Sequence, residues 1–181
     1  MKDDMKIRLF NKVIVEGFDH YVYSIDTDQK IVDHNVLTYK QITKENMDEA
    51  GAAIGNTTGR WILNDYPFAR GYIFYDPQGH QAGSCWLMFK GGDEKLYKIR
   101  KSDSFIFRLE VDEAYQGKGY SKMIMDHMLK IASAQGAKNV CLVCARKNTK
   151  AVNLYEKIGM KRSERKIFFR VFDHNIPYYE L

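Results

Sequence analysis

The residues best suited to chemistry in this sequence form a turn, Gln116-Gly117-Lys118-Gly119-Tyr120-Ser121, between two apolar segments. Residues 105–111 are rich in β-branched and aromatic side chains, and in residues 123–131 apolar side chains recur at helical spacing. A strand therefore leads directly into a helix, whose first N–H groups lack partners inside the helix and lie at the positive end of its dipole. Gly117 and Gly119 leave these amides uncovered, and Lys118 adds a positive charge. The turn is thus suited to bind an anion such as phosphate.

Two familiar phosphate-binding motifs do not fit this turn. Its glycines lack the GxGxxG spacing, and no Gly-Lys-Ser/Thr follows a four-residue gap as it does in a P-loop. The sequence therefore argues against a dinucleotide or nucleoside-triphosphate site. On its glycines alone, the turn could be a phosphate site or an ordinary connection between a strand and a helix.

A second stretch, from Asn148 to Met160, follows another predicted buried strand at residues 140–145. With the turn, it resembles the GNAT superfamily of N-acetyltransferases, which combines Val-x-x-x-Tyr-Arg/Gln-x-x-Gly-x-Gly/Ala with a later Asn-x-x-Ala-x-x-Leu-Tyr-x-Lys-x-Gly-Phe. The likeness covers residues 36–175, and its diagnostic part is 105–160. Ser121 replaces the usual Gly or Ala, and Met160 replaces the usual Phe. The matching residues are Val111, Tyr115, Gln116, Gly119, Ser121, Asn148, Ala151, Leu154, Tyr155, Lys157 and Gly159.

The resemblance implies acetyl-CoA as co-substrate, with its pyrophosphate on the turn. It also implies that strands 105–111 and 140–145 are parallel and diverge, which leaves backbone groups for the pantetheine arm to bond like an added strand. The N–H groups around Leu109 and Val111 would bind the thioester carbonyl. The implied cofactor-binding residues are Leu109, Val111, Gln116, Gly117, Lys118, Gly119, Tyr120, Ser121 and Asn148.

Acetyl transfer to an amine needs a neutral amine, a stabilised oxyanion and a proton for the leaving thiolate. The resemblance implies Tyr155 as the acid, because the family places this hydroxyl near the sulfur. Asn148 lies seven residues before Tyr155, on the same helix face. The candidate base is Glu110, which points away from the face of Leu109 and Val111 and could reach an amine through water. The alternatives are a core tyrosine at 155 and a surface or salt-bridged Glu110.

The predicted fold class is α/β: a GNAT-type mixed, mostly antiparallel sheet of about seven strands with flanking helices, two splayed central parallel strands and an N-terminal β-hairpin. A turn at residues 76–80 joins two antiparallel strands, and a helix is expected from Thr43 to Ile54. The remaining helices are expected after residue 119 and from 149 to 158. The core strands are predicted at residues 36–42, 71–75, 81–89, 105–111, 140–145, 162–171 and 176–181.

The hairpin is predicted from two apolar runs, residues 7–15 and 18–25, with Glu16-Gly17 between them. We expect residues 1–35 to form this extension, packed on an acetyltransferase domain of residues 36–181. The aromatic side chains of Tyr21 and Tyr23 could line the acceptor pocket, form a subunit contact in a homodimer, or cover a sheet edge.

A further aromatic segment, residues 60–68, shapes the acceptor pocket in the family. The resemblance therefore implies Trp61, Tyr66 and Phe68 as substrate-binding residues. For Trp61 the alternative is a buried aromatic anchor. We expect these side chains and those of the hairpin to lie opposite the cofactor.

The composition, with 45% hydrophobic and 28% charged residues, is typical of a globular domain and excludes general disorder. The sequence has no apolar run of membrane-spanning length and no signal-peptide core, so we expect a cytoplasmic protein without membrane partners. Three cysteines in apolar segments favour reduced thiols, and no metal site is expected. The net charge of +5 is spread along the chain, so we expect no nucleic-acid partner.

These observations predict an acetyl-CoA-dependent N-acyltransferase that moves an acetyl group directly to a primary amine of a small molecule or peptide. The alternative is a CoA-binding regulatory or interaction module without turnover. Peptide N-termini, lysines, polyamines, aminoglycosides and amino sugars all remain open as acceptors.

Overall fold

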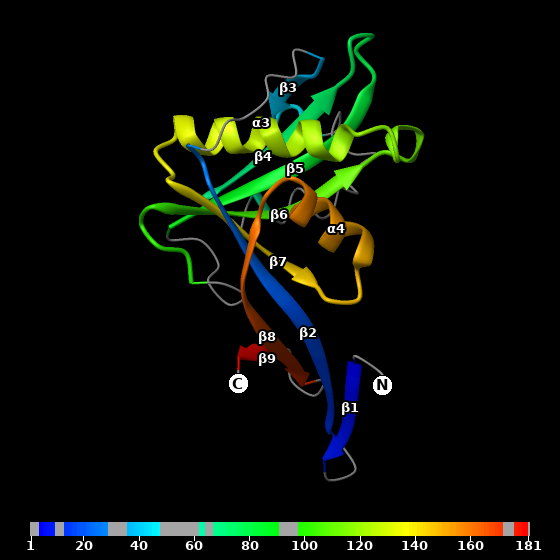
Figure 1. The fold of residues 1–181 in the computed structure, drawn as a ribbon, viewed down its shortest axis with the longest axis vertical. Helices are drawn as coiled ribbons and strands as arrows, with labels where there is room; N and C mark the ends of the chain where they lie inside the picture. Colours follow the sequence, from blue (N-terminus) through cyan, green and yellow to red (C-terminus); the bar gives the residue numbers. More distant parts are fainter. Residues whose placement is uncertain are drawn as a thin grey trace. The chain divides into compact units, whose positions relative to one another are not determined.

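The computed structural model describes residues 4–9, 13–28, 36–47, 62–63, 67–90, 98–171 and 176–180. Figure 1 shows the ribbon, coloured along the chain. No helix among these residues is both long enough and apolar enough to cross a membrane. The elements are β1 (Asp4–Leu9), β2 (Val13–Asp26), β3 (Thr38–Gln41), β4 (Ala69–Tyr75), β5 (Gln81–Phe89), β6 (Asp103–Val111), η1 (Glu113–Tyr115), α3 (Tyr120–Ala134), β7 (Asn139–Ala145), α4 (Thr149–Lys157), β8 (Lys161–Val171) and β9 (Ile176–Glu180).

The chain divides into two compact units. The α3 unit comprises Asp26–Asp93 and Ile99–Val140, and contains strands β3 to β6 with η1 and α3. The α4 unit comprises Met1–Ile25, Glu94–Lys98 and Cys141–Leu181, and contains β1, most of β2, α4, β8 and β9. Strand β7 begins in the first unit and ends in the second.

The sheet of the α3 unit has the order β3-β4-β5-β6, with antiparallel neighbours. Its register brings Ile73 opposite Ser84 and Ser84 opposite Glu110, so these three residues face the same side. At the start of β6, the carbonyl of Ser102 accepts a hydrogen bond from the N–H of Lys138, the residue that precedes β7. Strands β6 and β7 are neighbours in the sheet and begin side by side, so they run parallel. The sequence predicts this orientation for the pair.

Each face of this sheet has its own core. Helix α3 packs against β5 and β6, and a Cβ added at Gly83 would come within 3.1 Å of Ile124 on that helix. The next residues of β5 that face the other way, Ser84 and Trp86, therefore lie on the face opposite α3. There Trp86 packs in a buried cluster with Ile42, Ile62, Ala69 and Ile73. The two layers bury β4, β5 and the first half of β6.

In the α4 unit the strand order is β7-β2-β8-β9, and β1 also pairs with β2. Strand β2 is the long central member: it pairs with β8 from Val15↔Val171 to Ser24↔Lys161, with a bulge between Val22 and Tyr23. The second part of β2 carries buried apolar side chains, including Val22, Tyr23 and Ile25.

The predicted order of strands is confirmed, but the turn predicted at Glu16-Gly17 is wrong. Both residues lie inside β2, where Gly17 pairs with Met5 of β1 and with Phe169 of β8. Hydrogen bonds to neighbours on both edges keep a glycine extended, although its intrinsic preference is for turns. The N-terminal hairpin therefore pairs β1 with β2 in the register Leu9↔Val13. Residues 48–54 of the helix predicted from Thr43 lie outside the described residues.

Candidate active site

The turn that follows β6 has the geometry of an anion-binding loop. Between η1 and α3, Gly117 has a φ of 74° and Gly119 a φ of 86°. Residues with a Cβ atom are strained at such angles, which explains why glycine occupies both positions. In the described part of the chain, no backbone carbonyl accepts a hydrogen bond from the N–H groups of Gly117, Gly119, Tyr120 and Ser121.

These N–H groups lie in an open part of the surface. A Cβ added at Gly117 or Gly119 would meet no atom within 4 Å. Lys118 between them is exposed, with its ammonium 5.9 Å from the centre of the Tyr115 ring. Unbonded amides at a helix N-terminus, together with a lysine, are a suitable donor set for a pyrophosphate. The predicted cofactor residues 116–121 thus lie together in one exposed turn.

Strand β6 contains a bulge that the sequence does not predict. Phe107 pairs with Trp86 and Glu110 pairs with Ser84, so Arg108 and Leu109 together oppose Cys85. Arg108 has a φ of 50°, which is uncommon for a residue with a side chain. A bulge interrupts the ladder of backbone hydrogen bonds at Leu109, one of the residues predicted to bind the thioester carbonyl. No feature of the sequence signals it, since arginine has no preference for such a conformation.

Glu110 is half-buried at the end of this bulge, on the face opposite α3. Burial raises the pKa of its carboxyl group, the charge of Arg108 lowers the pKa, and that of Asp112 raises it. The Arg108 Nη1 atom lies 3.7 Å from Glu110 Oε1. A carboxyl group with a raised pKa is better suited to accept a proton near neutral pH than an exposed one. The ion pair that was the alternative interpretation of Glu110 is also present.

Three buried polar atoms lie on the same face of the sheet as Glu110. They are Tyr75 Oη, Ser84 Oγ and Trp86 Nε1, and none has a hydrogen-bond partner in the described part of the chain. Buried polar atoms are normally paired, so these three side chains give the face that carries Glu110 a polar character. Ile62 and Leu63 pack on this face as well, and they directly follow the predicted acceptor residue Trp61 in the sequence.

The predicted acceptor residues are only partly described. Trp61 and Tyr66 lie outside the described residues. Phe68 is 45% exposed and precedes β4, where its carbonyl accepts the N–H of Phe89. Phe74, opposite Gly83 and hence near Val111, is six residues further along, or about 20 Å at strand rise. Phe68 thus lies at the end of β4 remote from the 116–121 turn.

In the α4 unit, Asn148 is the N-cap of α4, because its side chain accepts a hydrogen bond from the N–H of Ala151 at 3.2 Å. Tyr155 is half-buried on this helix, with its ring centre 5.7 Å from that of Tyr23. The Tyr23 hydroxyl donates to Glu156 at 3.1 Å. Tyr155 is therefore oriented by packing on a buried neighbour, and Asn148 has a structural role whether or not it binds a ligand.

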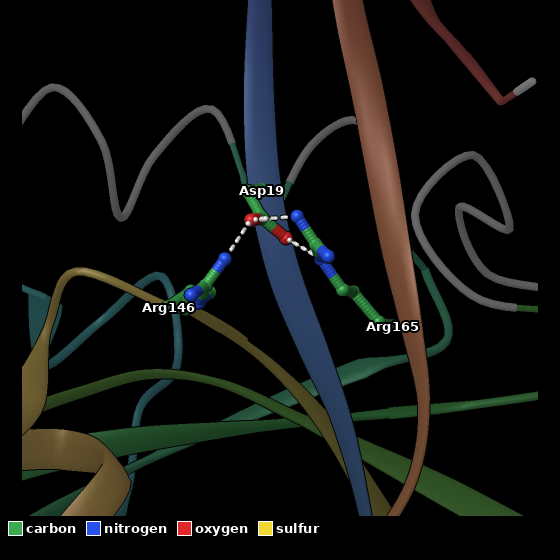
Figure 2. Close-up of polar contacts among 3 residues, drawn as sticks. All are labelled: Asp19, Arg146 and Arg165. Atoms are coloured by element: carbon green, nitrogen blue, oxygen red, sulfur yellow. Dashed lines mark hydrogen bonds and ion pairs between the residues drawn. The ribbon is translucent and has the colours of Figure 1, made fainter. Parts of the chain in front are cut away.

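The α4 unit also contains an ion-pair cluster that the sequence does not reveal. Figure 2 shows two guanidinium groups directed at Asp19 of β2. Arg165 of β8 donates through Nε and Nη2, both at 2.7 Å, and Arg146 donates through Nη1 at 3.0 Å. These arginines hold the pKa of Asp19 below its usual value, Arg165 having the largest effect. Since Arg146 N–H also donates to the Asp19 carbonyl at 2.9 Å, the cluster fixes the chain two residues before Asn148.

Solved structures with this fold come from distantly related proteins. A conserved protein of unknown function from Staphylococcus epidermidis matches with a TM-score of 0.67 at 14% identity, over 87% of this chain and 62% of that chain. A GCN5-related N-acetyltransferase from Sphaerobacter thermophilus matches with a TM-score of 0.61 at 16% identity, over 88% of this chain and 53% of that one. The IAA acetyltransferase from Bacillus cereus matches with a TM-score of 0.54 at 20% identity, over 71% and 79%. This chain thus spans less than two thirds of the length of the first two proteins. At these low identities, the similarities establish the fold alone.

The family is shown by the sequence itself. No curated protein is similar enough in sequence to be matched to this chain. The sequence model of the acetyltransferase (GNAT) family, however, matches residues 37–160, which include the 116–121 turn, Glu110, Asn148 and Tyr155. The fold is accordingly the mixed α/β fold of that family, with a mostly antiparallel sheet and one parallel pair of strands. The chain belongs to the acetyltransferase (GNAT) family.

Proposed function

We propose that this protein is an acetyl-CoA-dependent N-acetyltransferase that moves an acetyl group directly to a primary amine of a small molecule or peptide. One observation carries the proposal: in the described part of the chain, four N–H groups without a backbone carbonyl partner follow one another in an open turn at the N-terminus of α3, beside Lys118. Such a donor set suits a diphosphate group, and acetyl-CoA is the diphosphate-containing acetyl donor that the family implies.

The residues have separate roles in this proposal. The turn from Gln116 to Ser121 binds the pyrophosphate, and the N–H groups around Leu109 and Val111 bond to the thioester oxygen as negative charge develops on it. Glu110 accepts the proton of the acceptor ammonium, directly or through water, so that a neutral amine can attack. Tyr155 donates its proton to the sulfur as the carbon–sulfur bond breaks.

The acceptor binds, in this proposal, on the face of the α3 unit that carries Glu110 and the polar atoms of Tyr75, Ser84 and Trp86. Trp61 and Tyr66 are kept as predicted acceptor contacts. The position of Phe68, at the far end of β4, fits a contact with a distant part of a long acceptor better than one beside the reacting amine. A peptide or polyamine extends far enough for this, whereas a single amino sugar does not.

A CoA-binding module without turnover is the second candidate, and the packing of Tyr155 on Tyr23 is the observation in its favour. Calorimetric titration with acetyl-CoA tests binding, and thiol release with a panel of amines tests transfer. The panel should contain a peptide with a free N-terminus, an N-blocked lysine peptide, a polyamine, an aminoglycoside and an amino sugar. Binding with transfer supports the enzyme, binding without transfer to any amine supports the module, and the absence of binding refutes both.

A further inference from the structure

The turn between β4 and β5 contains a buried carboxylate, that of Asp76, whose side chain is 7% exposed. Its Oδ1 atom accepts hydrogen bonds from the N–H groups of Gln78 at 2.9 Å and His80 at 2.8 Å. The backbone closes the same turn, because the Asp76 N–H donates to the His80 carbonyl and the Gly79 N–H to the Asp76 carbonyl. One carboxylate oxygen and the backbone therefore suffice to hold the turn.

The second oxygen of Asp76 has a different partner. The Tyr115 hydroxyl donates to Asp76 Oδ2 at 2.7 Å, and the ring of His80, which is 75% exposed, lies 3.4 Å from the same oxygen. This hydrogen bond raises the pKa of Tyr115 to about 12, so the phenol remains a donor over the physiological pH range. A bond from a neutral hydroxyl to a carboxylate is shorter and stronger than one between neutral groups. The β4–β5 turn does not require the bond between Asp76 Oδ2 and Tyr115. The effect of this bond is to hold the side chain of Tyr115 in place.

Tyr115 in turn contacts the anion-binding loop. Its ring meets the ring of Tyr120, the first residue of α3, edge to face at 4.8 Å between centres. The ammonium of Lys118 lies over the same ring. Gly117 and Gly119 have no side chains, and the space beside them is empty. The ring of Tyr115 therefore contacts side chains on both sides of Gly119. The loop is also held by the N–H groups of Gln116 and Lys118, which donate to the carbonyls of Glu113 at 3.2 Å and Tyr115 at 3.4 Å, and by the 3.3 Å hydrogen bond from the Gln116 side chain to the Val111 carbonyl.

We propose that Asp76 is a positioning residue for the pyrophosphate of acetyl-CoA: through Tyr115 it holds the 116–121 turn in the conformation that presents its N–H groups to the ligand. The inference rests on the proposed function and adds two residues to it, one of them in a turn 39 residues before Tyr115. A glycine-containing loop that is ordered before the ligand arrives loses less conformational entropy on binding. The Asp76–Tyr115 bond should therefore contribute to affinity for the phosphate-bearing part of the donor and not to the chemistry of transfer.

The test compares two acetyl donors in Tyr115→Phe, which keeps the ring and removes only the hydroxyl. One donor is acetyl-CoA, and the other is the acetyl thioester of N-acetylcysteamine, which has no phosphate. We expect the dissociation constant of CoA and the KM of acetyl-CoA to rise about tenfold, while kcat and the KM of the short thioester stay at their wild-type values. Asp76→Asn keeps an oxygen for the Gln78 and His80 N–H groups and replaces the charge-assisted bond to Tyr115 by a weaker neutral one, so it should raise both constants by less than Tyr115→Phe does. The double variant should be no weaker than Tyr115→Phe, because that substitution already removes the bond.

The matched control is Tyr72→Phe. The hydroxyl of Tyr72 accepts a hydrogen bond from Gln135 at 3.1 Å at the other end of α3, so this variant also removes a tyrosine contact to the helix region but should leave both donors unaffected. Wild-type CoA affinity in Tyr115→Phe would overturn the inference, as would an equal loss for both donors with a lowered Tm, which indicates general damage to the fold. If the wild-type protein itself does not bind CoA, the proposed function is refuted and the inference with it. If it binds CoA but transfers no acetyl group, only the enzyme proposal fails, and the CoA dissociation constants of the variants still decide the inference.

Discussion

Arg108 combines an unusual backbone conformation with a charge beside the candidate base. Its φ of 50° costs conformational free energy, on the order of 1 kcal/mol for a residue with a side chain. The same bulge brings its guanidinium to within 3.7 Å of Glu110. A cation so close keeps the pKa of Glu110 from rising as far as burial alone would raise it. The side chain of Arg108 thus adjusts the pH range in which Glu110 can accept a proton.

Removing the charge of Arg108 should therefore shift the pH dependence of transfer. Arg108 favours the ionised form of Glu110, so Arg108→Gln raises the pKa of Glu110. Since the base acts when it is deprotonated, the acidic limb of kcat/KM against pH should move to higher pH in the Gln variant. Arg108→Lys keeps a positive charge and should shift the limb much less. An unchanged limb in Arg108→Gln would show that Glu110 is not the group that titrates.

Tyr155→Phe tests the candidate acid. Loss of a positioned general acid typically lowers the rate about 10²–10⁴-fold, so kcat should fall in that range while the dissociation constant of acetyl-CoA stays nearly unchanged. Tyr23→Phe is the matched control, because it removes the hydroxyl of the neighbouring ring, which donates to Glu156, and should have a small effect on kcat. Wild-type kcat in Tyr155→Phe would assign the tyrosine to packing alone.

At the scale of elements, Asp19 joins β2 to β8 and to the end of β7. Its side chain is 6% exposed, whereas those of Arg146 and Arg165 are 41% and 54% exposed. Asp19→Asn should therefore lower the free energy of unfolding by roughly 1–3 kcal/mol at neutral pH, the usual range for hydrogen bonds to a charged group. The exposed arginines can regain water, which keeps the effect below that of a fully buried pair.

The pH dependence of this effect has a defined sign. The pKa of Asp19 is lowered in the folded protein from its usual 3.8, so its contribution to stability is present above that pH and is lost as the pH falls through the lower folded value. Urea unfolding of wild type and Asp19→Asn should give stabilities that converge as the pH falls below about 4. Asp28→Asn, at an exposed position, should change stability little at any pH. A difference that persists at low pH would exclude the ion pairs as its cause.

The order of the strands and helices could be predicted from local sequence patterns. The features that are predicted wrongly or not at all depend on contacts between residues far apart in the sequence, which such patterns do not contain. From the sequence alone, Gly17 indicates a turn. In the structure it lies inside a strand, because β1 and β8 pair with β2 on its two sides. Asn148 is predicted here as a cofactor contact, which stays a prediction; asparagine before a helix is also a preferred N-cap, and its side chain does cap α4. The bond from Arg165 to Asp19 spans 146 residues, and no periodicity in the sequence relates the two.

At the scale of the molecule, the proposed functions are divided between two units. The anion-binding turn, Glu110 and the Asp76–Tyr115 bond belong to the α3 unit, whereas Asn148, Tyr155 and the Asp19 cluster belong to the α4 unit. Variants in the turn should therefore change the affinity for acetyl-CoA, and Tyr155→Phe should change turnover. A ligand that binds only the native protein also stabilises it, by about 2.7 kcal/mol at a concentration of 100 times Kd.

Thermal unfolding with and without acetyl-CoA makes this stabilisation measurable. For a chain of this size, such a gain raises the Tm by roughly 5–10 °C. Gly119→Asp should abolish the shift, because it places a negative charge where a phosphate would bind. Gly119→Asn is the matched control: asparagine tolerates a positive φ and carries no charge, and the space beside Gly119 is open, so most of the shift should remain. Shifts as large as that of the wild type in both the Asp and the Asn variant would mean that the pyrophosphate does not bind at this turn. A wild-type protein with neither a shift nor a heat of binding would not use acetyl-CoA at all.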